Sequence, residues 1–209
     1  KKAIILSSGG VDSTTCLSVA VNALGAENVS TASIFMDRSI KGSWMPQGGG
    51  GDYHVPHYEF DLAQIMQYSN CSLLSHSTES IVHKSYGEQI AEKGAGKVST
   101  YVPFRNGLMI SVAASLAAGI YEEEETDIYV GAHGDDAAGE AYADCSPRFL
   151  KPWGKRLLSA HTQGASGFPF ADKNKTGVVA EGLKLGTPYE LTWSCYEGAT
   201  RLAANAGPA

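Results

Sequence analysis

The chain has 209 residues, of which 43% are hydrophobic and 18% charged, a composition typical of one globular domain with its own core. The formal net charge is −6, so we expect no nucleic-acid-binding surface, and no apolar stretch reaches the roughly 18 residues that span a membrane. The apolar run at residues 3–6 is too short for the core of a signal peptide, which predicts a cytoplasmic protein.

The predicted elements alternate along the chain between strands and helices. Strand-like apolar runs occupy residues 3–7, 29–36, 57–62 and 127–132. Helical patterns occupy residues 12–24, 105–118 and 178–185. Asp12 or Ser13 could cap the first helix, and Gly25 could end it. This alternation predicts an α/β fold in which helices cover both faces of a parallel sheet.

Two stretches interrupt this alternation. Residues 38–52 contain GSWMPQGGGGD and have no helical period, although a parallel crossover normally carries a helix. They are either a functional loop or a poorly determined part of the sequence. Residues 159–170 are also expected to be a loop. The sequence has no internal repeat and no interdomain linker, so residues 1–209 are expected to form a single domain.

The four cysteines, Cys16, Cys71, Cys145 and Cys195, are widely spaced, and no two of them form a C-x-x-C pair. A disulfide framework is therefore not expected. Buried thiols are the simplest expectation, above all for Cys16 and Cys71.

The sequence SSGGVDST, at residues 7–14, is the strongest functional signal and follows the first predicted strand directly. A glycine pair lets the backbone turn tightly beside a ligand, and the helix that follows directs free N–H groups toward that turn. Hydroxyl groups of Ser8, Ser13 and Thr14 add donors for an anion. An ordinary turn with a capping Asp12 is the alternative, but the complete string between a strand and a helix favours a phosphate-binding loop. The string matches neither the Walker loop nor G-x-G-x-x-G.

Four ordered segments carry a resemblance to known proteins. S-G-G-x-D-S resembles the signature of the PP-loop ATP pyrophosphatase superfamily. The segments that resemble the 7-cyano-7-deazaguanine synthase (QueC) family of queuosine biosynthesis are SGGVDSTTCL at 8–17, VSTYVPFRNGLMISVAASLA at 98–117, GAHGDDAAGEAYADCSPRF at 131–149 and LGTPYELTWSCYEG at 185–198. The resemblance implies a Rossmann-like PP-loop fold, the adenine nucleotide alpha hydrolase architecture, for an ATP-binding domain over residues 1–209.

The resemblance also implies two ATP-dependent steps on one carboxylate. 7-Carboxy-7-deazaguanine is adenylated, and ammonia displaces AMP to give the amide. The amide oxygen is then adenylated, and loss of AMP leaves the nitrile. Mg²⁺ and positive groups must screen the carboxylate and the α-phosphate, because both are anionic.

Two other functions are compatible with parts of the sequence. The alternative within the same chemistry is a related enzyme that adenylates a deazapurine carboxylate and transfers it to another acceptor. A nucleotide-binding module without catalysis is disfavoured by the intact S-G-G-V-D-S string. The expected partners are small molecules, with no membrane and no nucleic acid, and the family suggests a homodimer.

Site residues are carried over from the matching segments. The residues expected to hold the pyrophosphate of ATP are Ser7, Ser8, Gly9, Gly10, Val11, Asp12, Ser13 and Thr14. The candidate catalytic residues are Asp12, which could reach Mg²⁺, Arg105, His133 and Asp135. The candidate substrate-binding residues are Arg105, Asn106, Asp136 and Asp144.

Several of these residues also have structural interpretations. Arg105 begins a helix, where a cation is unfavourable without an anionic partner, so it either grips a carboxylate or phosphate or is a surface arginine. Asn106 either caps that helix or binds a base. His133 is either catalytic or a hydrogen-bonded structural histidine, and an aspartate could accept the donor edge of a guanine-like ring.

The C-terminal segment departs from the family pattern. In the family, the cysteine of T-W-S-C is the first of four that bind a structural zinc, whereas no further cysteine follows Cys195 in this sequence. One thiolate cannot complete the tetrahedral site of Zn²⁺. We therefore expect residues 190–209 to be the remnant of a zinc module, and Cys195 to bind Zn²⁺ only together with further cysteines of a longer protein.

Overall fold

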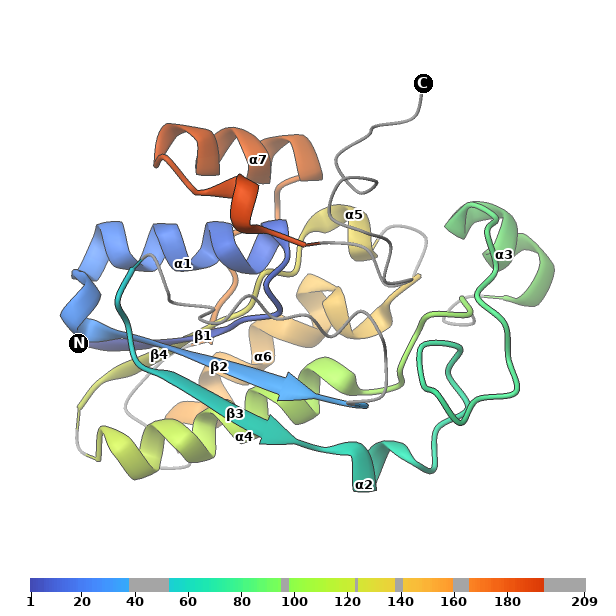
Figure 1. Cartoon of the computed structure of the whole chain (residues 1–209), viewed down its shortest axis with the longest axis horizontal. Coiled ribbons are helices and arrows are strands. Elements are labelled where there is room, and N and C mark those ends of the chain that lie inside the picture. The colour runs from blue at the N-terminus through green and yellow to red at the C-terminus, as the bar shows by residue number, and fades with distance from the viewer. Residues whose placement is uncertain (38–52, 95–97, 123, 138–140, 160–165, 194–209) are drawn as a thin grey trace.

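A parallel β-sheet of five strands lies at the centre of the molecule (Figure 1). The structure is a computed structural model that describes residues 1–37, 53–94, 98–122, 124–137, 141–159 and 166–193. In chain order the strands are β1 (Lys2–Leu6), β2 (Val29–Phe35), β3 (His57–Asp61), β4 (Thr126–Tyr129) and β5 (Ser166–Gly167). Their order across the sheet is β3-β2-β1-β4-β5, and all neighbouring pairs are parallel.

Helices cover both faces of this sheet. They are α1 (Val11–Leu24), α2 (Ala63–Met66), α3 (Tyr86–Lys93), α4 (Arg105–Ile120), α5 (Gly134–Ala137), α6 (Pro147–Ser159) and α7 (Lys175–Lys184), with the short 3-10 turns η1 (Ala26–Asn28), η3 (Ala143–Cys145) and η4 (Tyr189–Leu191). Helices α1 and α7 lie on one face, and α4 and α6 lie on the other (Figure 1). The predicted α/β fold, with a parallel sheet between two helical layers, is therefore confirmed.

The central strand β1 contributes to both halves of the core, because successive side chains of a strand point to opposite faces. Ile5 packs with Leu17 on the α1 side, and Ile4 packs with Ile110 on the α4 side. Both isoleucines are fully buried. Each such side chain stabilises the fold by about 1.5–3 kcal/mol on leaving water. Residues 7–14, which we call the phosphate loop, thus follow a strand that is fixed from both faces.

The strands and helices predicted from the sequence occur within a few residues of their expected ends. The prediction for the cap of α1 is wrong: Gly10 occupies the N-cap position with φ −82°, and neither Asp12 nor Ser13 caps the helix. The helix begins at Val11, directly after the glycine pair, so Asp12 and Ser13 belong to its first turn instead. Gly25 does end α1, with φ 84°, a conformation that favours glycine.

Helices α3 and α6 are not predicted by the apolar pattern. Helix α3 is short, yet its start carries a capping box in which Ser85 and Glu88 bond each other's backbone N–H groups. Helix α6 contains Pro152, a residue that normally interrupts a helix. Residues 38–52 lie outside the described residues, as do residues 160–165 of the predicted second loop, and β5 follows them.

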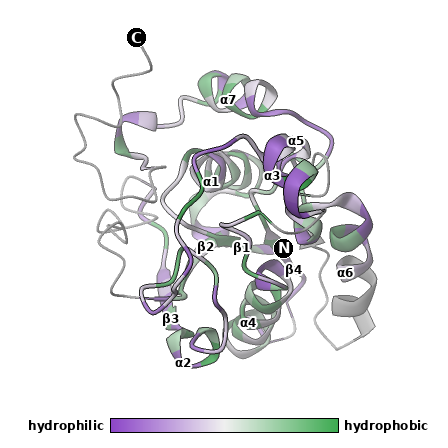
Figure 2. Cartoon of the chain, turned by 90° about the vertical axis from the view of Figure 1, so that its right-hand side faces the viewer, coloured by the Kyte–Doolittle hydropathy of each residue, from purple (hydrophilic) through white to green (hydrophobic). Residues whose placement is uncertain are grey.

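Figure 2 views the molecule from the side toward which β2 and β3 run and colours each residue by its hydropathy. The two helical layers lie above and below the sheet in this view, and α5 is hydrophilic. Within the part of the chain that the structure describes, no helix is both long and apolar enough to cross a membrane. The carboxyl ends of the parallel strands meet on this side, and the candidate site lies there.

Candidate active site

A cavity of about 480 Å³ opens at the carboxyl ends of the central strands. Its wall is formed by the ends of β1 and β2, the starts of α1 and α4, and the segment that follows β4. The sheet order changes direction here, because β1 has β2 on one side and β4 on the other. Open α/β sheets bind ligands at such a switch point, and the volume is typical of a small-molecule site.

The phosphate loop is held in shape by its own hydrogen bonds. The backbone N–H of Ser8 donates to Ser13 Oγ at 3.2 Å, and this hydroxyl donates to the Gly10 carbonyl at 3.1 Å. Gly9 has φ 73°, which glycine adopts without strain. The backbone N–H of Trp193 donates to the Gly9 carbonyl at 2.9 Å and ties the loop from outside. The loop therefore has a fixed shape before any ligand binds.

Most of the phosphate loop faces the cavity. The residues that line the wall are Ser7, Ser8, Gly10, Asp12 and Ser13, with Gly9, Val11 and Thr14 outside it. The Thr14 hydroxyl is turned back and donates to the Gly10 carbonyl at 2.9 Å. The first N–H groups of a helix have no acceptor within it, and together with the helix dipole they favour an anion. Five of the eight residues predicted to hold pyrophosphate thus lie in the wall of one cavity.

The segment after β4 approaches the phosphate loop closely at Gly131. A Cβ atom at this position would lie 2.9 Å from the Asp12 carbonyl carbon and 3.0 Å from the Ser13 nitrogen. Only glycine lets the two backbones meet at this distance. The sequence prediction missed this role, although a glycine within a strand pattern is a signal for such an approach.

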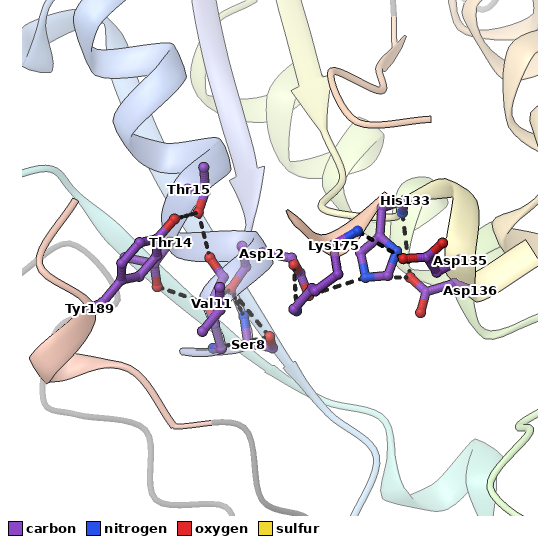
Figure 3. A network of polar contacts seen from close by, with 12 residues as sticks. Ser8, Val11, Asp12, Thr14, Thr15, His133, Asp135, Asp136, Lys175 and Tyr189 are labelled. Carbon is purple, nitrogen blue, oxygen red and sulfur yellow. Dashed lines mark hydrogen bonds and ion pairs between the residues drawn. The ribbon is translucent and has the colours of Figure 1, made fainter. Parts of the chain in front are cut away.

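The Asp12 carboxylate is paired with Lys175, whose Nζ donates to both carboxylate oxygens at 2.6 Å (Figure 3). Lys175 is the first residue of α7 and lines the cavity. Asp135 accepts the Lys175 backbone N–H at 2.8 Å and lies outside the cavity wall. The sequence prediction missed Lys175. Its signal is a lysine at a helix N-terminus, where a cation needs an anionic partner.

His133 connects two carboxylates in this part of the cavity wall. Its Nε2 lies 3.8 Å from Asp12 Oδ2 and 3.6 Å from Asp136 Oδ2 (Figure 3). The histidine is 6% exposed, and its Nδ1 has no hydrogen-bond partner among the described residues. Burial raises the pKa of Asp136 above its ordinary value, and the nearby His133 opposes this effect. His133 and Asp136 both line the cavity and are candidates for proton transfer there.

Arg105 and Asn106 begin α4, and both line the cavity. Asn106 does not cap its own helix, because Phe104 occupies the N-cap position. Its Nδ2 donates to the Asp144 carbonyl at 3.1 Å and to Cys145 Sγ at 3.2 Å. Asp144 is 2% exposed and is not part of the cavity wall. The structure therefore brings Arg105 and Asn106 to the same cavity as Asp12 and places Asp144 behind them.

The three buried cysteine thiols, Cys16, Cys71 and Cys145, are not suited to act as nucleophiles. Burial and the nearby carboxylates of Asp136 and Asp144 raise the pKa of Cys145 to about 12, so this cavity-lining thiol is neutral at ordinary pH. Cys16 and Cys71 are also free and buried, as predicted. None of the three has the character of a nucleophile.

Aromatic and apolar side chains also line the cavity. Tyr86 and Tyr142 bond through their hydroxyl groups at 3.0 Å, and their rings meet edge-on with centroids 5.4 Å apart. Phe35, Leu73 and Met109 belong to the same wall. Aromatic side chains stack on flat rings, so this part of the wall is a candidate contact surface for one. It is absent from the sequence prediction, because the two tyrosines are 56 residues apart and share no local pattern.

Few of the described side chains are placed to bind a metal ion. Among the described residues, no group of three or more His, Cys, Asp and Glu side chains could hold a metal ion. Cys195 lies outside the described residues, so zinc binding stays a prediction. Asp12 presents carboxylate oxygens to the cavity, and these are the donors that Mg²⁺ prefers.

Comparisons with known proteins agree on one family. A sequence model described as "Queuosine biosynthesis protein QueC" matches residues 2–207. A 7-cyano-7-deazaguanine synthase of Archaeoglobus fulgidus is 31% identical over 208 residues, which are 99% of this chain and 82% of the relative. The synthase of Oceanobacillus iheyensis is 33% identical over 202 residues, which are 95% of this chain and 85% of the relative.

A solved structure was also found to be similar. It is the U34-tRNA thiolase NcsA from Methanococcus maripaludis, with a TM-score of 0.47 and 14% sequence identity. The alignment covers 97% of this chain and 63% of the thiolase chain, so this chain spans less than two thirds of that protein.

Proposed function

The chain belongs to the QueC family of queuosine biosynthesis proteins, and from this premise we propose its reaction and the residues that perform it. It is an ATP-dependent ligase that converts 7-carboxy-7-deazaguanine and ammonia to 7-cyano-7-deazaguanine through adenylated intermediates. The observation that carries this proposal is a preformed phosphate loop in the wall of a cavity that aromatic side chains also line. Transfer to another acceptor is not favoured, because the curated relatives are named for the nitrile product.

The part of the wall around the phosphate loop is assigned to ATP. The pyrophosphate group would bind beside Ser8, Gly10 and Ser13 at the positive end of the α1 dipole, and Lys175 adds a positive charge there. Asp12 would hold the Mg²⁺ that accompanies ATP, together with the phosphates themselves. When bound, that ion screens the negative charges of the two reacting groups.

The aromatic part of the wall is assigned to the deazapurine ring, with Tyr86 and Tyr142 as its contact surface. The substrate carboxylate must meet the α-phosphate, so it has to lie between the two parts. Arg105 lines the cavity at the start of α4, and its planar guanidinium group matches a carboxylate in shape and charge. Adenylation joins a carboxylate oxygen to the α-phosphate and releases pyrophosphate onto the phosphate loop.

His133 and Asp136 are assigned to proton transfer. Conversion of ammonia to the nitrile removes each proton from the nitrogen in turn, and a base must accept them. The raised pKa of Asp136 makes its carboxylate a stronger base than an ordinary aspartate, and His133 Nε2 lies 3.6 Å from it. Asp135 acts more remotely, through the Lys175 backbone N–H that it accepts.

Zinc binding and dimerisation are proposed from the family alone. We expect the product of the complete gene to be a homodimer with about one zinc per chain, held by Cys195 and further cysteines. Metal analysis of that protein tests the expectation. Less than about a tenth of an equivalent of zinc would make Cys195 an ordinary thiol.

The reaction is tested by product analysis. The protein is incubated with ATP, Mg²⁺, ammonium and 7-carboxy-7-deazaguanine, and mass spectrometry measures AMP, amide and nitrile. We expect about two AMP for each nitrile, because each of the two adenylated intermediates loses one AMP in the step that follows its formation. AMP without nitrile, in the presence of ammonium, would indicate a different acceptor, and no AMP would contradict the ATP assignment.

A further inference from the structure

The start of α4 has an unusual backbone. Phe104 occupies the N-cap position with φ 60° and ψ 17°, in the left-handed region that bulky residues rarely adopt. Its side chain makes no capping hydrogen bond. The ring lies close to Gly107, where a Cβ atom would meet ring atoms at 2.7 Å. Helix α4 therefore begins directly at Arg105, without the polar cap that a helix start normally has.

A carboxylate from another part of the chain takes the place of that cap. Asp144, in η3, accepts the backbone N–H of Asn106 at 2.8 Å through Oδ2. The two residues are 38 positions apart in the sequence. A carboxylate at this position satisfies a helix N–H group and interacts favourably with the helix dipole.

The contact between Asp144 and Asn106 is reciprocal and buried. The Asn106 side chain donates back to the Asp144 carbonyl at 3.1 Å. Asp144 is 2% exposed and Asn106 is 7% exposed, so solvent competes weakly for these bonds. Asp144 is outside the cavity wall, whereas Arg105 and Asn106 belong to it. From outside the cavity wall, Asp144 thus holds Asn106, the neighbour of Arg105 in the first turn of α4.

Charge supports the same arrangement. A cation at a helix N-terminus is disfavoured, and Arg105 is the first residue of α4. Burial raises the pKa of Asp144, while the Asn106 N–H and the charge of Arg105 oppose that rise. The negative charge of Asp144 therefore stabilises the positive charge of Arg105, whereas the dipole of α4 disfavours that charge at the helix N-terminus.

We propose that Asp144 is a positioning residue, which caps α4 from η3 and thereby directs Arg105 toward the substrate carboxylate. It serves substrate binding through the helix and reads no part of the base. This inference rests on the proposed function for the identity of the substrate. The cap itself is independent of that identity and has a test of its own.

The experiment compares three single variants, Asp144→Ala, Asp144→Asn and Arg105→Lys. It also includes the double variant that combines Asp144→Ala with Arg105→Lys. Asp144→Asn keeps an oxygen that can accept the Asn106 N–H, whereas Asp144→Ala removes it. Val29→Ala is the control for lost stability, because Val29 is 1% exposed and lies at the amino end of β2, away from the cavity. Kinetics for the carboxylate, melting curves and amide hydrogen exchange at residue 106 are measured for each.

We expect Asp144→Ala to lower kcat/KM at least about tenfold, mainly through KM, and Asp144→Asn to stay within about threefold of the parent. In the Arg105→Lys background, Asp144→Ala should add less than about a twofold loss, because both act through one group. Exchange at residue 106 should accelerate in Asp144→Ala without any substrate. Val29→Ala should lower the melting temperature and leave KM unchanged.

Three results would overturn the inference. Unchanged KM in Asp144→Ala, with a loss of stability like that of Val29→Ala, would make the role structural only. Asp144→Asn as defective as Asp144→Ala, with losses that multiply with Arg105→Lys, would place the carboxylate on the substrate. Unchanged exchange at residue 106 would disprove the cap. A parent protein that forms no AMP would contradict the proposed function instead, and the exchange measurement would still decide the cap.

Discussion

Helices α1 and α4 begin at the same cavity, and their first turns are completed in different ways. Helix α1 has Gly10 at its N-cap and no side chain bonded to its first turn from that position. Helix α4 has Phe104 at its N-cap, and Asp144 accepts one of its first N–H groups. The start of α1 therefore lies in a loop of small residues that lines the cavity, whereas the start of α4 is bonded to a carboxylate of the protein.

The difference favours α1 as the helix start for the proposed phosphate site. The dipole at a helix N-terminus attracts an anion, and at α4 a carboxylate of the protein already takes that place. Helix α7 is also capped by a side chain, because Asn174 Oδ1 accepts the Gly177 N–H at 2.9 Å. Around one cavity, α1 therefore supplies the positive end of its dipole, while α4 and α7 supply the side chains of Arg105 and Lys175.

The largest effects are expected at the uncapped helix. Ser13→Ala removes the hydroxyl that closes the phosphate loop, and Asp12→Ala removes the carboxylate beside it. Each should lower AMP formation by roughly 10²-fold or more, as for a lost transition-state contact, with the fold retained. Ser111→Ala is the matched control, because the Ser111 hydroxyl bonds the Gly107 carbonyl within α4. Near-normal turnover in both variants would refute the ATP site.

A smaller loss is expected at the start of α7. Lys175→Met should lower kcat/KM for ATP roughly 30-fold, the equivalent of about 2 kcal/mol for a charged hydrogen bond. Lys184→Met, at the exposed end of the same helix, should be close to the parent. Steady-state kinetics at varied ATP checks both. Equal, small effects of the two variants would limit Lys175 to a structural ion pair with Asp12.

The start of α4 should show a still smaller effect. Arg105→Lys keeps the charge and loses the planar fork, so kcat/KM for the carboxylate should fall at least about tenfold, or roughly 1.4 kcal/mol. The melting temperature should change little. Arg148→Lys, at an exposed position of α6, is the control. Unchanged kinetics with lowered stability would place Arg105 in a structural ion pair.

The sequence predicted the two helix starts unequally, for physical reasons. The phosphate loop is a local signal, because eight consecutive residues between a strand and a helix determine its shape. The partner of Asp12 is not local: Lys175 is 163 residues away and meets it only when α7 packs on α1. The cap of α4 has the same character, since no propensity at Phe104 or Arg105 points to Asp144.

The smallest predicted effect is a pH dependence at Asp144. Its pKa is raised in the folded protein, so the folded state binds the proton more tightly than the unfolded chain. The parent should therefore lose stability, relative to Asp144→Asn, as the pH rises from below the unfolded pKa through the folded pKa. Melting curves of both proteins between about pH 3 and pH 8 measure this. A constant difference, or one that changes in the opposite direction, would contradict the raised pKa.

The comparison of the two helix starts is tested most directly by titrating ¹⁵N-labelled protein with inorganic pyrophosphate and Mg²⁺. Amide resonances of residues 9–13 should shift strongly and saturably, because the positive end of the α1 dipole lies at the proposed anion site. The amides of Asn106 and Gly107 should shift little, since Asp144 already occupies the start of α4. Strong shifts at Asn106 and Gly107, with none at residues 9–13, would contradict the assignment of the phosphate site to α1.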